Sequence, residues 1–316
     1  MKVIEHLKEA KETLISFEII PPKRGGDIED ILDLVSRLKK YNPSFIDVTS
    51  HAAEIEYIET DRTIKKIVMR KRPGTLVVGS EIQRSEKYGI DTVLHVLCRG
   101  FTREETEDFL IEMNYARLKN VLAVRGDSER YKTNSIERSV NNYAVDLVKQ
   151  IVDMNNGKYL NNPHSKKTDF CIGVCGYPEV HFEAPNMETD IKHLKGKVDA
   201  GADYIVTQMF FDNKKYFNFV EKCREAGINV PIIPGLKILT KKEHLTSLPK
   251  TFHISIPYEL SSEVEKVTKS EFAEDVGVEW AAKQVEELLN KKVPALHFFV
   301  MKNDEAIHKV MKKIGF

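Results

Sequence analysis

Short apolar segments alternate with amphipathic segments along the whole chain. Residues 15–22 (ISFEIIPP) open the series. Ile and Phe favour a half-buried strand, and the two prolines end it because they cannot donate to a strand ladder. Residues 27–38 then carry apolar side chains at helical spacing, which predicts an amphipathic helix. The first forty residues therefore predict a strand followed by a helix.

The same alternation continues to the end of the chain. Further strands are predicted at residues 45–50, 92–98, 120–127, 170–179, 204–212, 230–238 and 295–301. Helices are predicted at residues 61–72, 102–118, 143–154, 188–200, 214–226 and 304–313, with a leading helix in residues 1–13 and extra helices within 258–291. Residues 75–82 (TLVVGSEI) look extended as well, but we favour residues 92–98 as the third strand. Residues 128–142 are predicted to be a polar loop.

Strands that alternate with helices fit either an open doubly wound sheet or a closed β/α barrel. No G-x-G-x-x-G follows the first strand, so the usual dinucleotide signature of the open sheet is absent. Polar residues repeatedly end the apolar strands, and in a barrel these ends share one mouth. The residues are Glu18, Thr49, His95, Arg125 with Asp127, Tyr177 with Glu179, and Gln208. Any one of them could be a loop anchor, but their repetition favours a shared cavity. We expect residues 1–316 to form a single eight-stranded β/α (TIM) barrel with extra helices.

Composition excludes several classes of partner. Acidic and basic side chains balance at 48 each, and a nucleic-acid surface would need a clustered basic face. No apolar run approaches the roughly 18 residues of a membrane span, and the first residues lack a signal-peptide core. Cys98, Cys171, Cys175 and Cys223 are too dispersed for a disulfide framework or a zinc site. We therefore expect a cytoplasmic protein without nucleic-acid, membrane or metal partners.

Glu18 is the candidate acid. It lies among apolar residues near the end of the first predicted strand. Burial disfavours the charged form of a carboxyl group, so we expect a raised pKa for Glu18. Such a group can give a proton near neutral pH. An edge glutamate that points to water is the alternative on this stretch alone.

Several motifs, taken together, resemble those of bacterial single-domain methylenetetrahydrofolate reductases. They are FEIIPP from residue 17, DVTS from 47, DRT from 61, HVLC from 95, RGD from 125, YPEVH from 177, KVDAGADYIVTQMFFD from 197 and IIPG from 232. Each motif would be common by chance, but their order and spacing would not. The resemblance runs from residue 15 to the last predicted helix.

The resemblance implies an FAD-dependent enzyme that reduces 5,10-methylenetetrahydrofolate to 5-methyltetrahydrofolate. NADH or NADPH would be the hydride donor, and donor and folate would use one flavin face in turn. In this interpretation Glu18 gives the proton that opens the folate's one-carbon ring to an iminium cation. Asp127 would be the fixed negative charge that stabilises the cation. The resemblance also implies a homo-oligomer.

The other site residues are implied by matching the motifs. Expected flavin contacts are Thr49, Ser50, Ala52, His95, Arg125, Gly126, Asp127, Tyr143, Ala144, Tyr177, His181, Ala184, Asp190 and Lys197. Expected folate contacts are Glu18, Thr49, Asp127, Gln208, His244, Leu248 and Lys302. Asn303 stands where relatives have an arginine for the folate's carboxylate tail, which makes Lys302 the candidate cation. Phe299 lacks the hydroxyl of a tyrosine found in relatives. Residues 75–88 are expected to be an insertion relative to shorter relatives.

Two alternatives remain open at this stage. One is a related flavin barrel that oxidises another amine such as proline, and the pairing of Glu18 with Asp127 speaks against it. The other is a non-catalytic barrel subunit of a larger complex. Such a subunit would be expected to lose the acid or the flavin ligands, and this chain has both.

Overall fold

Eight parallel strands close into a barrel in the computed structural model, which describes residues 1–126, 138–268 and 272–316. In order around the barrel the strands are β1 (Leu14–Ile19), β10 (Ala295–Met301), β9 (Ile232–Leu236), β8 (Tyr204–Met209), β7 (Cys171–Gly176), β6 (Asn120–Val124), β5 (Asp91–Leu97) and β2 (Phe45–Val48). The first and last strands of the chain are neighbours, with Ser16 opposite His297 and Glu18 opposite Phe299. The predicted barrel is confirmed.

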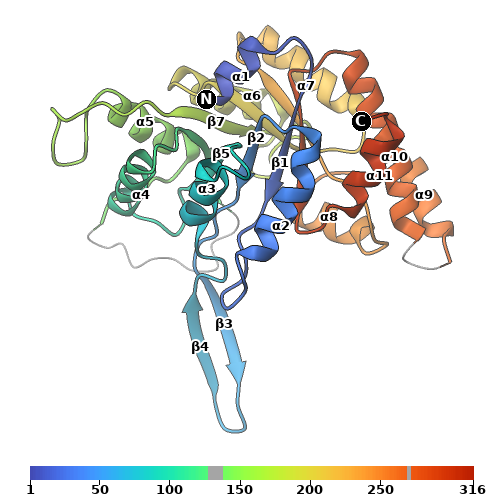
Figure 1. The fold of residues 1–316 in the computed structure, drawn as a ribbon, viewed down its shortest axis with the longest axis horizontal. Coiled ribbons are helices and arrows are strands. Elements are labelled where there is room, and N and C mark those ends of the chain that lie inside the picture. Colours follow the sequence, from blue (N-terminus) through green and yellow to red (C-terminus); the bar gives the residue numbers. More distant parts are fainter. Residues whose placement is uncertain (127–137, 269–271) are drawn as a thin grey trace.

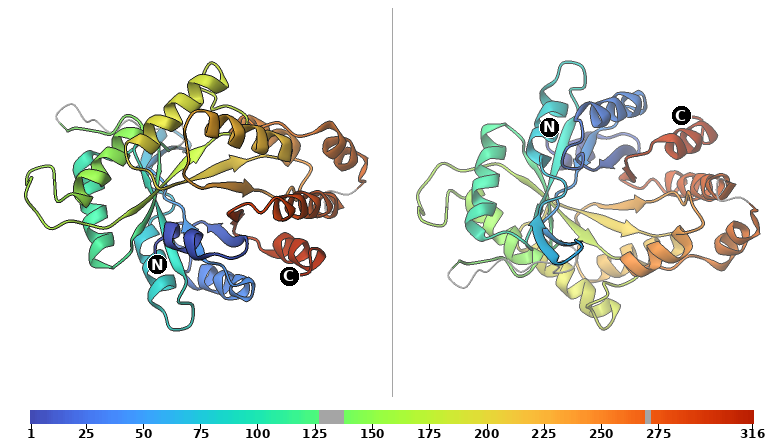
Figure 2. Two further views of the ribbon diagram at one scale, coloured as in Figure 1. Left: turned by 90° about the horizontal axis from the view of Figure 1, so that it is seen from above. Right: turned by 90° about the horizontal axis from the view of Figure 1, so that it is seen from below.

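Helices surround the barrel, as Figures 1 and 2 show. They are α1 (Val3–Glu9), α2 (Glu29–Leu38), α3 (Thr75–Arg84), α4 (Arg103–Tyr115), α5 (Ala144–Asn155), α6 (Met187–Asp199), α7 (Asn213–Glu225), α8 (His244–Phe252), α9 (Tyr258–Lys266), α10 (Phe272–Asn290) and α11 (Glu305–Lys313), with a 3-10 turn, η1 (Lys39–Tyr41). The extra helices α9 and α10 precede β10, as predicted. Thr102 caps α4 through a hydrogen bond from the Glu105 N–H group, in the predicted capping box. None of the described helices is long and apolar enough to cross a membrane.

Two predictions between β2 and β5 are wrong. Residues 61–72, predicted as a helix, contain β4 (Ile64–Met69), which pairs with β3 (Glu54–Glu59) in a hairpin that projects from the barrel (Figure 1). Residues 75–82, which look extended in the sequence, belong to α3. Short apolar runs do not distinguish a buried helix from a strand. Helix α3 is the helix that a β/α barrel requires between β2 and β5. The insertion therefore corresponds to the β3–β4 hairpin and not to residues 75–88.

Side chains alternate between two apolar layers along each strand. Phe17, Ile46 and Phe298 pack outward with the helices, whereas Phe45 and Val93 pack inside the barrel. Each such fully buried side chain stabilises the fold by about 1.5–3 kcal/mol. The inner layer is mostly apolar towards the N-terminal ends of the strands, where Phe45 and Val93 lie.

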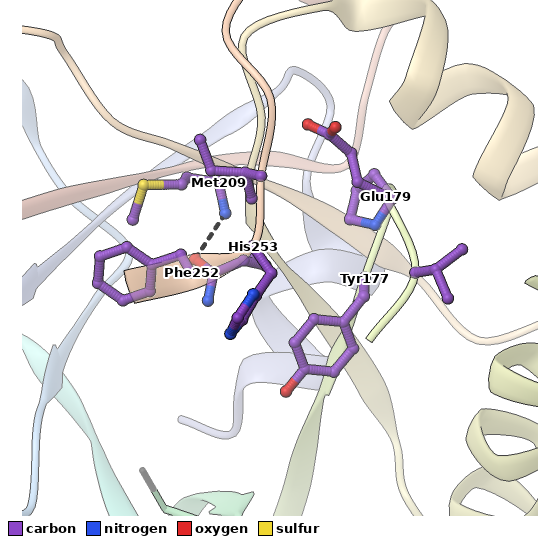
Figure 3. Close-up of a pocket in the computed structure, with 9 residues that line it drawn as sticks. Tyr177, Glu179, Met209, Phe252 and His253 are labelled. Carbon is purple, nitrogen blue, oxygen red and sulfur yellow. Dashed lines mark hydrogen bonds between the residues drawn. The ribbon is translucent and has the colours of Figure 1, made fainter. Parts of the chain in front are cut away.

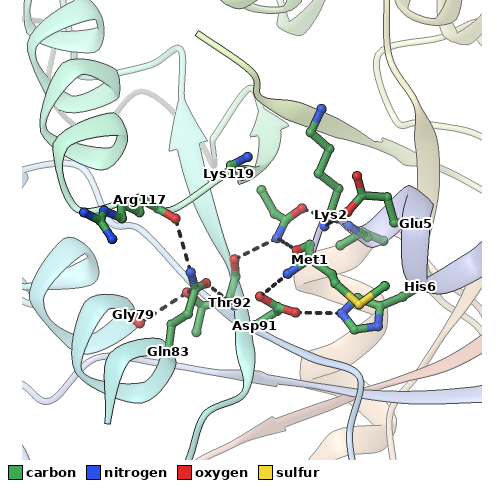
Figure 4. A network of polar contacts seen from close by, with 12 residues as sticks. Met1, Lys2, Glu5, His6, Gly79, Gln83, Asp91, Thr92, Arg117 and Lys119 are labelled. Carbon is green, nitrogen blue, oxygen red and sulfur yellow. Dashed lines mark hydrogen bonds and ion pairs between the residues drawn. The ribbon is translucent and has the colours of Figure 1, made fainter.

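Residues at the start of the chain and in helix α1 join a network of polar contacts with β5 (Figure 4). Val3 joins the inner apolar cluster, and its N–H group donates to the Asn120 side chain at 2.9 Å. The Met1 amino group and His6 Nε2 lie 2.7 and 2.8 Å from the Asp91 carboxylate. These contacts tie α1 to β5 and β6 at the end opposite the predicted mouth.

Candidate active site

The C-terminal strand ends carry the predicted polar residues at one end of the barrel. They are Glu18 on β1, Thr49 after β2, His95 on β5, Arg125 after β6, Tyr177 after β7 and Gln208 on β8. Because all eight strands are parallel, these ends open on one mouth. Asp127 lies outside the described residues. In the described part of the chain no group of three or more His, Cys, Asp or Glu side chains could hold a metal ion.

Glu18 lies in a buried cluster with two histidines. Its Oε2 atom is 3.5 Å from His95 Nε2 and 3.8 Å from His297 Nε2. Ser16 Oγ is 2.9 Å from His297 Nδ1 and orients that ring. All four side chains are less than 10% exposed. The cluster is therefore a carboxyl group held between imidazoles with little access to water.

The expectation of a raised pKa for Glu18 is wrong. Burial raises the pKa of Glu18, but interactions with His297, His95 and Lys237 lower it by more, so the net pKa is below the ordinary value. The apolar neighbours Phe17 and Ile19 along β1 face outward. The groups that face Glu18 come from β5, β10 and the end of β9, which the local sequence does not reveal.

Lys237 is the residue that directly follows β9. Its ammonium group donates to the Phe299 carbonyl at 2.8 Å. Burial lowers the pKa of Lys237 to about 8, although the Glu18 charge opposes the shift. Lys237 therefore changes charge close to physiological pH.

Asp47 and His297 were missed by sequence reasoning. Asp47 Oδ2 lies 3.4 Å from His95 Nε2, and Asp47 Oδ1 lies 3.9 Å from His297 Nδ1. Both Asp47 and His297 are fully buried. The sequence did contain a signal for Asp47. Residues two apart on a strand point to the same side, so Asp47 on β2 should point the same way as the predicted site residue Thr49 just after it. The position of His297 opposite Ser16 required the barrel register.

A second cluster places cations at the ends of β5 and β6. The Arg125 guanidinium contacts the Glu183 carboxylate and lies over the Tyr143 ring, 4.8 Å from its centre. Arg99 Nη2 is 3.5 Å from the same carboxylate. Arg125 Nε is buried without a hydrogen-bond partner among the described residues. Gly126 has φ of 88°, a conformation that glycine adopts without strain.

Helix α6 adds the predicted pair Asp190 and Lys197 to this cluster. Asp190 Oδ2 accepts the His181 N–H group at 2.8 Å, and Lys197 Nζ donates to the Cys175 carbonyl at 2.6 Å. Burial lowers the pKa of Lys197. The His181 ring meets the Tyr177 ring edge-on at 4.6 Å. The structure therefore joins both helix charges to β7 and the loop that follows it.

The remaining predicted flavin residues lie on loops around the same end. Thr49 Oγ1 is 3.1 Å from His51 Nε2, and Ser50 follows it at the start of the loop to the hairpin. A Cβ atom at Gly100 would lie 2.6 Å from the Ala52 side chain, so these two loops touch. Ala144 begins α5, and the Ala184 N–H group donates to the His181 carbonyl at 2.8 Å.

A small pocket lies between the ends of β7 and β8 and the end of α8 (Figure 3). Its lining includes Tyr177 and Gln208, and the Gln208 Oε1 atom accepts the Met209 N–H group at 2.9 Å. Glu179, also in the lining, accepts the Ser255 N–H group at 3.0 Å and pairs with Lys215. Glu179 is therefore a loop anchor.

The other predicted folate residues are spread along the rim. His244 begins α8, and its Nδ1 atom accepts the Thr240 N–H group at 3.2 Å. Leu248 is buried in an apolar cluster with Met209 and the extra helices. Lys302 is exposed just after β10. The structure thus brings Glu18 within 3.5 Å of His95, whereas Lys302 is exposed just beyond β10.

Together the fold and the site define a β/α-barrel protein with a buried acid–imidazole cluster beside a cationic cluster at its C-terminal mouth. The family model of methylenetetrahydrofolate reductase matches residues 2–315, so the chain belongs to the methylenetetrahydrofolate reductase family. The family resemblance expected from the motifs is confirmed.

Relatives of two lengths match the chain. Methylenetetrahydrofolate reductase 2 of Saccharomyces cerevisiae is 30% identical over 328 residues, covering 100% of this chain and 50% of that protein. The 5,10-methylenetetrahydrofolate reductase of Salmonella typhimurium is 28% identical over 302 residues, covering 95% of this chain and 90% of that protein. The chain spans about half the length of the eukaryotic relatives it matches.

A solved structure shares the fold. It is a protein from Clostridium thermocellum described as binding two copies of 5-methyl-5,6,7,8-tetrahydrofolic acid. The TM-score is 0.60 at 14% sequence identity, and the match covers 98% of this chain and 96% of that one. At this identity the likeness supports the barrel fold alone.

Proposed function

We propose that this chain reduces 5,10-methylenetetrahydrofolate to 5-methyltetrahydrofolate, with FAD bound and NADH or NADPH as the hydride donor in a ping-pong sequence. Residues 1–316 would act as a single catalytic domain. The observation that carries the proposal is Glu18, buried between His95 and His297 at the barrel mouth, in a chain of this family.

Glu18 is proposed as the group that gives the proton. The methylene bridge becomes reactive when one C–N bond breaks, and the departing amine nitrogen must then take a proton. Against the effect of burial, the histidines and Lys237 lower the Glu18 pKa, but the carboxyl group is less than 10% exposed and has two imidazoles within 4 Å that can supply the proton it gives. Asp127 is proposed as the fixed charge that stabilises the resulting cation.

The cationic cluster suits the diphosphate of FAD, which when bound would carry the hydride between the nicotinamide and the folate. Arg125 has a buried Nε without a partner in the described chain, and the partly buried Lys197 ammonium group adds a second cation. Guanidinium forks pair well with diphosphate oxygens. Tyr143 would face the adenosine side. The other proposed contacts are Thr49, Ser50, Ala52, His95, Gly126, Asp127, Ala144, Tyr177, His181, Ala184 and Asp190.

For the folate we propose contacts with Glu18, Thr49, Asp127, Gln208, His244, Leu248 and Lys302. Membership of the methylenetetrahydrofolate reductase family supports this class of substrate. Lys302 would attract the carboxylate tail as a point charge rather than as a fork. We also propose a homo-oligomer, which light scattering would test.

A visible absorption spectrum tests the proposal. The purified protein is expected to show a flavin spectrum that NADH or NADPH bleaches without oxygen and that 5,10-methylenetetrahydrofolate restores. Comparing bleaching rates with the two donors decides the nicotinamide preference. Restoration by proline-derived imines but not by the folate would favour the related amine oxidoreductase. A protein that binds no added FAD would contradict the proposal and favour a non-catalytic subunit.

A further inference from the structure

Asp47 is a fully buried carboxyl group without a hydrogen-bond partner among the described residues. Both of its oxygens lack one, and so do His95 Nε2, His297 Nε2 and the Tyr204 hydroxyl nearby. The nearest basic atom is His95 Nε2, at 3.4 Å from Asp47 Oδ2. A buried carboxylate is costly unless a positive charge or a proton compensates it. Asp47, His95, His297 and Tyr204 form a buried polar layer, and the charge of Asp47 has to be balanced by a proton within this layer.

His95 bridges the two carboxyl groups. Its Nε2 atom is 3.5 Å from Glu18 Oε2 and 3.4 Å from Asp47 Oδ2, so a proton on Nε2 serves both. Burial alone lowers the pKa of His95, but the contact with Asp47 and the charge of Glu18 raise it above its ordinary value. Such distances are long for hydrogen bonds, as is common before a substrate is bound. The geometry favours an imidazolium between the two carboxyl groups.

The apolar surroundings strengthen the interaction between the Asp47 charge and His95. The titratable and charged groups that face this layer are Glu18 on β1, Asp47 on β2, Tyr204 on β8, Lys237 after β9 and His297 on β10. Beneath them lie apolar side chains such as Phe45, Val93 and Leu122. Charges interact more strongly in such low-dielectric surroundings than in water. Asp47 itself has no exposed surface, so it cannot touch a substrate.

We propose that Asp47 is a positioning residue that keeps a proton on His95 Nε2, from which Glu18 is supplied. This inference rests on the proposed function. In the step, the proton leaves His95 Nε2 for Glu18 Oε2 as Glu18 gives its own proton to the amine nitrogen. That nitrogen also takes the electrons of the breaking C–N bond. His95 is left neutral beside the Asp47 anion, which favours its re-protonation from solvent.

The variant Asp47→Asn tests this role in the flavin-loaded enzyme. The amide keeps the shape of the side chain and removes its charge. The pKa of His95 should therefore fall by about one unit or more, which is the usual effect of losing a nearby opposite charge. NMR titration of the histidine ring protons measures this shift, and the missing signal of His95→Gln assigns the resonance. The alkaline limb of the folate half-reaction should move in the same direction, while reduction by the nicotinamide donor stays unchanged.

Asp203→Asn is the matched control. Asp203 accepts the Ile172 N–H group at 2.8 Å at the N-terminal end of β8, away from the mouth. The Asp203→Asn substitution should leave the His95 titration and the pH profile of the folate half-reaction as in the wild type.

A wild-type His95 titration in Asp47→Asn would overturn the inference. We expect the variant to fold, since the amide keeps the size and shape of the carboxyl group. If it does not, Asp47→Ser gives the same measurement. Absence of folate reduction by the wild type would refute the proposed function instead, and the titration would still report on Asp47.

Discussion

The Nε2 atom of His297 in the last strand lies 3.8 Å from the Oε2 atom of Glu18 in the first strand. Pairing of β1 with β10 creates this contact, because Ser16 and Glu18 lie opposite His297 and Phe299. The candidate acid and one of its two imidazole neighbours therefore meet only when the barrel closes. The site is therefore complete only when β1 and β10 are paired.

Glu18→Gln should separate the two half-reactions. The amide fills the same space but has no acidic proton, so folate reduction should fall by about 100-fold or more. Flavin binding and its reduction by NADH should persist, because neither needs this proton. Anaerobic stopped-flow spectroscopy measures both steps in one sample. Unchanged folate turnover would remove Glu18 from the mechanism.

Asp127→Asn should slow folate reduction by about 100-fold to 1,000-fold, the usual effect of removing one preorganised electrostatic group. The flavin should remain bound, since the substitution preserves the size of the side chain. Single-turnover kinetics with the reduced enzyme measure the effect. If the variant only fails to fold, the electrostatic role assigned to Asp127 is wrong.

Lys197→Met should weaken FAD binding by about tenfold or more, because one charge-assisted hydrogen bond contributes roughly 1.5–3 kcal/mol. Its ammonium group is partly buried and donates to the Cys175 carbonyl. Lys195→Met is the control, since Lys195 lies on the same helix but pairs with Asp199. Fluorescence titration of the flavin-free proteins compares the two. Equal affinities would exclude Lys197 from the cofactor site.

Gly173→Ala should destabilise the barrel by about 1–3 kcal/mol. A Cβ atom there would lie 2.4 Å from the ring of Tyr204, which is fully buried and has no room to move. Gly196→Ala on α6 meets no atom within 4 Å and should stabilise the protein by about 0.4–1 kcal/mol. Urea unfolding measures both. Equal changes in the two variants would contradict the close packing inside the barrel.

Lys237→Met should flatten the pH dependence of stability in the alkaline range. The pKa of Lys237 is about 8 in the folded protein against an ordinary value of 10.5. Between these values the unfolded chain binds more protons, so the free energy of unfolding rises with pH, by up to about 1.4 kcal/mol per unit. The difference between wild type and variant in urea unfolding from pH 8 to 10.5 isolates this effect. Parallel curves would show that Lys237 titrates normally.

Sequence reasoning recovered the barrel because its signals are local. Apolar runs such as residues 120–124, the capping box at Thr102 and the polar residues at strand ends are all readable from spacing. It failed between β2 and β5, where residues 64–69 became a strand and residues 75–84 a helix. There, propensity is weak and pairing with a partner strand decides the outcome.

Outside the segment between β2 and β5, the alternation of strands and helices, the closed barrel and the end at which the polar residues gather could be predicted from the sequence alone, since period and turn chemistry act over a few residues. The sign of the Glu18 pKa shift and the role of Asp47 were decided by the tertiary structure. The reason is that a pKa depends on charges through space, and His95, Lys237 and His297 reach Glu18 from three other parts of the barrel.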